Sequence, residues 1–283
     1  MKRRNLKYRI NWQDTWNEMR KERMIKPQIS YDADFFKKTA QGFSMRIKFN
    51  DYEFGRKTTG ILSEILADNF EVLEIGTGPG TLTIPLSKRV KSIVGIEFSK
   101  INAKNLKTNL EEDKLDNVEI VNKDWQEVDD DEIKGKFDLV VCSHFLWQVD
   151  DVERLLERME NASKKYCAVI QPCGRDEIVK EMFERLTNKK YTGQFEPDAD
   201  YFAYVILREW GRLVNVRYLD YIHERNLEEE IRYMAGFIGK FMEIDKAVKE
   251  MMEKYLLEKK EEAMYREKSS AVVLWWSPDG RRG

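Results

Sequence analysis

From residue 71 onward, short apolar runs alternate with stretches of helical periodicity. The runs cover 71–75, 92–97, 118–121, 137–142 and 166–171, and each has the length of a buried strand. Between them, apolar residues recur three and four positions apart, which predicts helices over about 80–89 and 99–113 and from residue 151. Strands that alternate with helices at this spacing indicate βαβ units and therefore an α/β fold with a doubly wound, mostly parallel sheet.

The residues before this core are helical and rich in aromatic side chains. Apolar spacing predicts helices over 11–25, 32–39 and 51–69. This leader either forms a lid over a ligand cleft or packs onto the sheet, and the pattern alone leaves both alternatives open.

After residue 175 the rhythm changes. The pattern predicts helices over 175–186 and 198–210, a strand over 213–223, two more helices and a closing strand over 271–276. No linker separates these parts, so residues 1–283 are expected to form one domain. It would consist of a leader (1–69), a core (70–175), and a helical insertion with closing strands (176–283).

Composition restricts the partners. Apolar residues make up 42% and charged residues 35% of the chain, and 49 basic residues face 51 acidic ones. The resulting net charge of −2 gives no bulk attraction to nucleic acid, although a local basic patch stays possible. No apolar run reaches the roughly 18 residues of a membrane span. The three cysteines, Cys142, Cys167 and Cys173, predict neither a disulfide framework nor a metal site and favour a reducing cytoplasm.

A glycine-rich loop follows the first predicted strand. Glu74, Gly76, Gly78 and Gly80 occupy alternate positions, with Thr77 between the first two glycines. A strand that turns through glycines into a helix is expected to present bare N–H groups to a ligand at the helix N-terminus. In the dinucleotide fingerprint G-x-G-x-x-G the third glycine would fall on Thr81. A carboxylate at the strand end would repel a pyrophosphate and suit a cationic ligand.

Acidic residues also follow the next two strands. Glu97, with Phe98 beside it, ends the second strand, where a carboxylate can accept two hydroxyls of a ribose. Asp124 follows the third strand and can accept from an adenine amine, while Trp125 can cover the base. The alternatives are a surface glutamate, a helix cap and a core tryptophan.

The segment after the fourth strand reads Ser143-His144-Phe145-Leu146-Trp147 and continues to Asp150. Ligands of open α/β sheets lie outside the carboxyl ends of the strands, so this segment should face the reacting group. His144 is the strongest candidate for a general base, and His223 is a weaker one. The alternative for His144 is packing against the ligand.

These motifs resemble, in order and spacing, those of class I S-adenosylmethionine (SAM)-dependent methyltransferases of the small-molecule type, over about residues 70–175. The resemblance implies a seven-stranded sheet whose last strand is antiparallel and lies between strands five and six. It implies SAM as cofactor and S-adenosylhomocysteine as product. The residues implied to bind the cofactor are Glu74, Gly76, Thr77, Gly78, Gly80, Glu97, Phe98, Asp124, Trp125 and Ser143.

The acceptor cannot be read from these motifs. We expect a small molecule bound by His144, Trp147, Tyr31, Phe35, Tyr191 and Arg225, without a membrane or nucleic-acid partner. The segment after strand four lacks the Asn/Asp-Pro-Pro-aromatic signature of enzymes that methylate base amines. The alternatives are an RNA or protein methyltransferase, a non-catalytic SAM or nucleotide sensor, and an NAD-dependent oxidoreductase.

Overall fold

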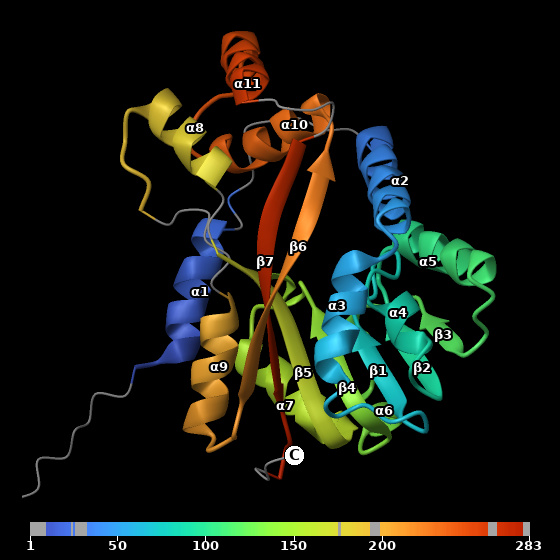
Figure 1. Cartoon of the computed structure of the whole chain (residues 1–283). Helices are drawn as coiled ribbons and strands as arrows, with labels where there is room; N and C mark the ends of the chain where they lie inside the picture. The colour runs from blue at the N-terminus through green and yellow to red at the C-terminus, as the bar shows by residue number, and fades with distance from the viewer. Residues whose placement is uncertain are drawn as a thin grey trace, which may run out of the picture.

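The computed structural model of the chain describes residues 10–23, 25, 33–174, 177–192, 199–259 and 265–279. These residues form a seven-stranded sheet in the order β3-β2-β1-β4-β5-β7-β6 (Figure 1). The strands are β1 (Glu71–Ile75), β2 (Ser92–Ile96), β3 (Val118–Val121), β4 (Phe137–Ser143), β5 (Ser163–Cys173), β6 (Asn215–Arg225) and β7 (Tyr265–Trp276). Only β7 runs antiparallel to its neighbours β5 and β6. The structure therefore confirms the expected seven-stranded sheet. It also confirms that the last strand is antiparallel and lies between strands five and six.

Helices cover both faces of the sheet because the central strands are apolar on both sides. One face carries α1 (Trp12–Arg23), α7 (Val152–Ala162) and α9 (Ala199–Glu209) (Figure 1). The other carries α3 (Glu53–Leu62), α4 (Thr83–Ser87) and α5 (Lys100–Glu112). In the described part of the chain, no helix combines the length and apolar character needed to cross a bilayer.

The leader divides between the two faces. The indole of Trp16 on α1 is fully buried and stacks on Trp147, with ring centres 4.4 Å apart. Of the two alternatives for the leader, α1 therefore packs onto the sheet layer rather than forming a lid. Helix α2 (Ala33–Phe49) continues ten residues beyond the predicted end at Thr39, because Ile47 is buried against the α5 side of the fold. Asp51 then takes a left-handed backbone (φ 52°), so α3 begins at Glu53 rather than at residue 51.

A third apolar cluster lies beyond the sheet. It joins α8 (Glu177–Thr187), α10 (Leu227–Ile238) and α11 (Lys246–Lys259) at the far ends of β6 and β7 (Figure 1). The two strands pair as far as Arg225 with Tyr265. This extension was not predicted, because the residues of β7 before Ala271 are mostly polar and lack a hydrophobic run. It carries the last residues of β6 past the carboxyl edge of the sheet.

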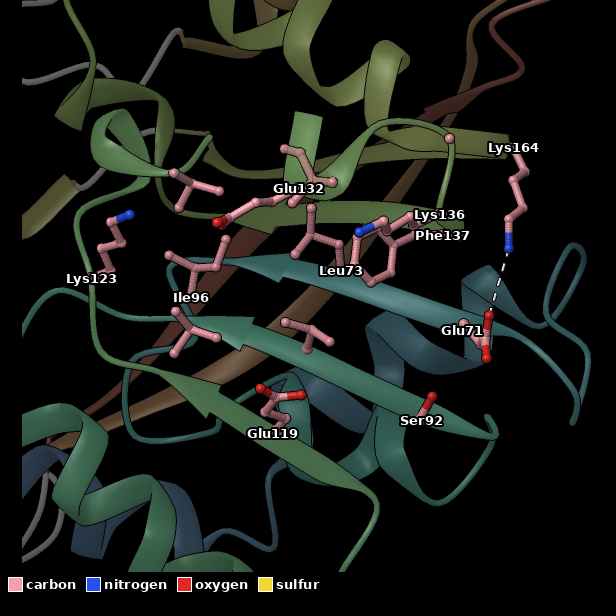
Figure 2. A pocket seen from close by; sticks show the side chains of 15 residues that line it. Glu71, Leu73, Ser92, Ile96, Glu119, Lys123, Glu132, Lys136, Phe137 and Lys164 are labelled. Carbon is pink, nitrogen blue, oxygen red and sulfur yellow. Dashed lines mark ion pairs between the residues drawn. The ribbon is translucent and has the colours of Figure 1, made fainter. Parts of the chain in front are cut away.

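One part of the sheet is thinly covered. Helix α6 (Asp130–Ile133) is a single turn, so a hollow of about 670 Å³ remains over β1, β2 and β3 (Figure 2). Its floor is apolar, with Leu73 and Ile96, and Lys164 pairs with Glu71 at 3.6 Å at its edge.

Candidate active site

A cavity of about 920 Å³ opens at the carboxyl ends of β1 and β4. Its walls come from three distant parts of the chain: the leader, the loops of the core and the end of β6. The core contributes Glu74, Gly76, Thr77, Gly78, Pro79, Thr81, Leu82, Ser143, His144 and Pro172. Among the other lining residues are Phe43, Arg46 and Phe54 from the leader and Tyr221, His223 and Arg225 from β6. The sheet edge that the sequence favours for ligand binding is therefore hollow.

Glycine is required at the three loop positions for different reasons. All have positive φ, which favours glycine (74°, 55° and 101°). A Cβ on Gly76 would lie 2.7 Å from the Phe145 ring, and one on Gly80 would lie 2.7 Å from Leu106. Gly80 does not line the cavity, so its requirement is packing against α5. A Cβ on Gly78 would meet nothing within 4 Å, and this residue does line the cavity.

The N–H groups of the three loop glycines are already bonded within the protein. The Gly76 N–H donates to Ile96 O at 2.8 Å, Gly78 N–H to the Glu97 carboxylate at 2.8 Å, and Gly80 N–H to Thr77 O at 3.1 Å. Helix α4 begins only at Thr83 and has five residues. The glycine N–H groups are therefore not bare, but no bond is described for the N–H groups of Thr81 and Leu82, which line the cavity, so a helix N-terminus open to the ligand stays a prediction.

Glu74 is a buried carboxyl group on this cavity. Its side chain is 1% exposed, and its Oε2 atom has no hydrogen-bond partner among the described residues. Burial raises the pKa of Glu74 to about 8, so the carboxyl is largely protonated at neutral pH. A buried oxygen without a partner is unusual, and a cationic ligand in the cavity would stabilise its ionised form.

Glu97 binds its own loop. Its carboxylate accepts from the Gly78 and Ser99 N–H groups, each at 2.8 Å, and burial raises its pKa. Neither Glu97 nor the exposed Phe98 is among the cavity-lining residues. Glu97 therefore fixes the conformation of the glycine loop, and its contact with a ribose stays a prediction, as does a contact by Phe98.

The pair after β3 has separated roles. Asp124 is exposed and accepts from Gln126 N–H at 2.9 Å, capping a short 3-10 helix. Its contact with adenine stays a prediction. Trp125 is 3% exposed, and the Arg158 guanidinium lies 4.1 Å from the centre of its ring. The prediction that Trp125 stacks on a base is wrong, because core residues and Arg158 already cover the indole.

Ser143 and His144 both line the cavity. His144 has φ 55°, and its N–H donates to Ile170 O at 2.9 Å, which turns the imidazole away from β4. Its Nδ1 lies 2.9 Å from Ser143 Oγ, and its ring packs edge-on to Phe54 at 5.0 Å. Desolvation by the cavity walls lowers the pKa of His144 to about 4, although part of the residue is exposed. The ring is therefore neutral at pH 7.

This wall also contains residues that the motifs did not reveal, namely Phe54, Tyr221 and Arg46. The ring of Phe54 also contacts Tyr221 at 4.9 Å, and Tyr221 contacts His223 at 4.8 Å. The only sequence signal was the alternation of Tyr221, His223 and Arg225 along a strand, which places them on one face. No local pattern marks Phe54 or Arg46.

A family model described as a methyltransferase domain matches residues 66–236, more than half of the chain. The chain belongs to the class I SAM-dependent methyltransferases. This methyltransferase has the fold of a putative methyltransferase from Bacillus halodurans, with 14% identity, a TM-score of 0.51, and coverage of 78% of this chain and 97% of that one. A putative SAM-dependent methyltransferase from Methanococcus maripaludis gives 21% identity and a TM-score of 0.47 over 67% and 91% of the two chains.

A curated relative matches only locally. A probable ribosomal RNA small subunit methyltransferase A from Methanosphaera stadtmanae is 42% identical over 78 residues, which are 28% of this methyltransferase and 27% of the relative. The chain spans roughly a quarter of the length of the curated relatives it matches.

The family cofactor fits what the cavity offers. SAM carries a sulfonium and an ammonium group, and the methyltransferase places the Glu74 carboxyl, whose Oε2 has no hydrogen-bond partner among the described residues, on the cavity wall. The open space at Gly78 would be filled by any Cβ. Glu74, Gly76, Thr77, Gly78 and Ser143 all line this cavity.

Only some of the residues predicted to bind the acceptor line the cavity. Arg225 and His144 line the cavity. Trp147 does not, because its indole is stacked on Trp16 in the core. Tyr191 does not either, because it packs on Phe183, 6.1 Å away, in the third cluster. Tyr31 and the side chain of Phe35 lie outside the described residues.

Proposed function

We infer that this methyltransferase transfers the methyl group of SAM to a small molecule by in-line displacement. The observation that carries this inference is the shared cavity, whose wall contains both the Glu74 carboxyl, with its unpartnered Oε2, and the neutral His144 imidazole. The carboxyl suits a cationic cofactor, and the imidazole supplies a proton acceptor.

SAM, when bound, supplies a methyl group already activated by the sulfonium. The chain then needs to hold the two reactants in line and to exclude water. Positioning of this kind can supply about 7–11 kcal/mol of barrier reduction. The Gly78 space and the Glu74 carboxyl would fix the cofactor, and the apolar walls around Phe54 would hold the acceptor.

His144 can take the proton that the acceptor loses. With Nδ1–H donating to the Ser143 hydroxyl oxygen, Nε2 is left as the proton acceptor. With SAM bound, the acceptor heteroatom would bond to the methyl carbon as the carbon–sulfur bond broke and left its electron pair on sulfur. The heteroatom proton would move to His144 Nε2, so that one positive charge would be lost at sulfur and one would appear on the imidazole.

A ribosomal RNA acceptor is the second candidate, and the local identity to an rRNA methyltransferase favours it. The balance of 49 basic and 51 acidic residues speaks against it. Transfer of a labelled methyl group to purified ribosomal subunits, but not to a small-molecule metabolite extract, would favour RNA.

Calorimetry with SAM and NAD tests the cofactor. We expect SAM to bind and NAD not to bind. The variant Gly78→Val should lose SAM binding because its side chain fills the cofactor space. Gly211→Val is the matched control, since Gly211 has φ 80° and open surroundings but does not line the cavity. Unchanged SAM affinity in Gly78→Val would refute this site.

The base is tested with His144→Gln. We expect kcat to fall about 100-fold, the lower end of general-base effects, with SAM affinity nearly unchanged. For the wild type saturated with SAM, the sign of the lowered pKa predicts a kcat that is lost only as pH falls towards about 4. A variant with an unchanged kcat and pH profile would leave His144 as a packing residue.

A further inference from the structure

We propose that the acceptor is an elongated organic acid whose carboxylate binds Arg46 and Arg225 at the far end of the cavity. This inference rests on the proposed function and names the substrate class of the same site. Three features carry it: the order of side chains along β6, the direction of the arginine pairs, and the apolar wall between them and His144.

The end of β6 arranges its side chains in a line. Tyr221, His223 and Arg225 alternate and share one strand face, and all three line the cavity. At about 3.3 Å per residue, Arg225 lies roughly 13 Å along the strand from Tyr221. Tyr221 is connected to His144 through Phe54 by ring contacts of 4.9 and 5.0 Å. Arg225 and His144 therefore lie at different positions along the cavity, with Tyr221 and Phe54 between them.

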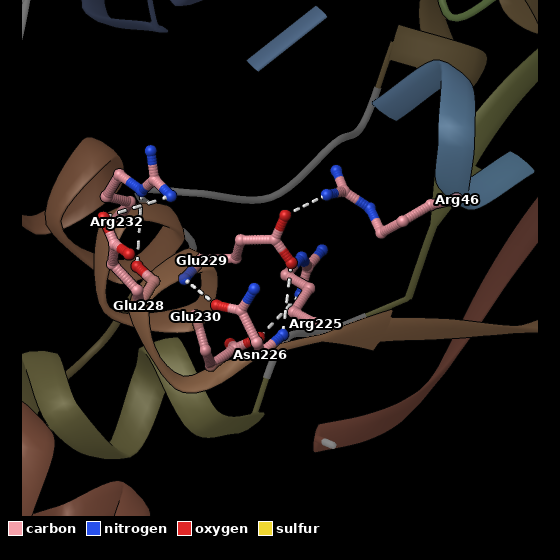
Figure 3. Close-up of polar contacts among 7 residues, drawn as sticks. All are labelled: Arg46, Arg225, Asn226, Glu228, Glu229, Glu230 and Arg232. Atoms are coloured by element: carbon pink, nitrogen blue, oxygen red, sulfur yellow. Dashed lines mark hydrogen bonds and ion pairs between the residues drawn. The ribbon is translucent and has the colours of Figure 1, made fainter. Parts of the chain in front are cut away.

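The two arginines lie beside the residues that begin α10 (Figure 3). Arg46 pairs with Glu229, and Arg225 pairs with Glu230 at 3.1 Å. Both arginines line the cavity, whereas Glu229 and Glu230 do not. A guanidinium carries five N–H donors, and Arg46 gives its Nη1 to Glu229. Both lining cations are therefore paired with carboxylates of α10 that are not themselves among the lining residues.

The electrostatics at His223 agree with this arrangement. Burial, together with the charges of Arg225, His144 and Arg46, lowers the pKa of His223 to about 3. Glu224 also lines the cavity, but it pairs with Arg266 at 2.8 Å. The potential at this end therefore disfavours an added proton and favours an anion.

The wall between the two ends is mostly aromatic. Phe43 and Phe54 come from the leader and Tyr221 and Tyr233 from the β6–α10 segment, and all four line the cavity. Ring faces and edges of this kind bury a planar apolar body. An acceptor with a nucleophilic heteroatom at one end, an apolar body and a carboxylate at the other would match the cavity along its length.

The cofactor also has a carboxylate, on its methionine portion, so two sources of the anion must be separated. Arg225 follows Tyr221 and His223 along β6, on the side of the cavity away from the glycine loop, which favours the acceptor. The experiment therefore measures both ligands on the same variants.

The test uses full-length protein saturated with S-adenosylhomocysteine and titrated calorimetrically with matched pairs of probes. Each pair is an acid and its amide, for example 3-(4-hydroxyphenyl)propanoate and 3-(4-hydroxyphenyl)propanamide, together with the 4-amino and 4-mercapto analogues. We expect at least one acid to bind about tenfold or more tightly than its amide, as expected for a charge-assisted hydrogen-bonded pair. Arg46→Gln should remove this preference and leave SAM affinity unchanged.

Two further variants complete the design. Arg232→Gln is the matched control, because Arg232 belongs to the same cluster, pairs with Glu228 and does not line the cavity. It should keep the acid preference. Arg225→Lys keeps the charge beside buried Glu230 and should weaken the preference without unfolding the protein. Preference for no acid over its amide, or a preference that survives in Arg46→Gln, would overturn the proposal.

An Arg46→Gln protein that loses SAM affinity but keeps the acid preference would assign the arginine to the cofactor carboxylate and also overturn the proposal. Failure of the wild type to bind SAM at all would instead reject the proposed function. The two failures are therefore distinguishable.

Discussion

Glu74 is a carboxyl group whose surroundings favour its neutral form. Its pKa is raised to about 8 by burial, so the ligand-free protein keeps this proton between the unfolded pKa of 4.5 and about 8. The sign follows: the stability contributed by this proton is present below pH 4.5 and is lost as pH rises through 8. A cationic cofactor reverses the preference, because an opposite charge nearby favours the carboxylate.

We therefore predict that SAM binding releases up to one proton near pH 6.5 and tightens as pH rises, by at most about tenfold per pH unit. Calorimetry in two buffers of different ionisation enthalpy measures the release. Glu74→Gln should abolish it and weaken binding at pH 8. Glu119→Gln, at an exposed residue outside the cavity, should release protons as the wild type does. Equal release by wild type and Glu74→Gln would exclude this role.

At the scale of elements, apolar runs predicted the sheet well because burial on both faces leaves an uninterrupted signal. β1 was predicted over its full length, and the strand predicted at β4 ends one residue before the observed end. The first half of β7 escaped prediction because its polar residues pair with β6 without being buried in the sheet core. Trp125 and Trp147 were misassigned because a tryptophan beside a strand end signals burial equally well in a core and in a pocket.

The docking of α1 is the element on which the lid interpretation can be tested. Trp16 is fully buried, stacks on Trp147, and its Nε1–H donates to Val149 O at 3.2 Å. We predict that Trp16→Ala lowers the free energy of unfolding by about 3–5 kcal/mol, the cost of removing a buried tryptophan. Urea titration measures it.

SAM affinity of Trp16→Ala should change little under native conditions, since α1 packs on the face of α7 and α9. Trp12→Ala, at a partly buried neighbour, should cost less. If Trp16→Ala had wild-type stability but altered SAM affinity, the result would favour a lid role for α1 over simple packing.

At the scale of the whole molecule, the cavity is closed by segments that are far apart in sequence. Arg46 meets Glu229 across 183 positions, so no local pattern could have paired them. The glycine loop was recognisable because one strand and one turn contain it. The acceptor end was not, because it exists only where α2, the end of β6 and α10 come together.

The connection between the sheet and the third cluster depends on the pair of Arg225 and Glu230. Glu230 is 1% exposed, and the Arg225 guanidinium also lies 3.7 Å from the centre of the Tyr233 ring. Arg225→Ala would leave a buried carboxylate without this partner, which typically costs about 3–5 kcal/mol. Arg232→Ala, whose partner Glu228 is exposed, should change stability by less than about 1 kcal/mol.

The double variant Arg225→Met/Glu230→Leu separates the cost of an unpaired charge from the value of the pair. Replacing both members of a buried pair by apolar residues of similar volume is often neutral or stabilising. We therefore predict that the double variant unfolds in urea close to the wild-type midpoint, while Arg225→Ala unfolds well below it. If the double variant were as unstable as the single one, packing of the guanidinium on Tyr233, rather than the charge of Glu230, would be what joins α10 to β6.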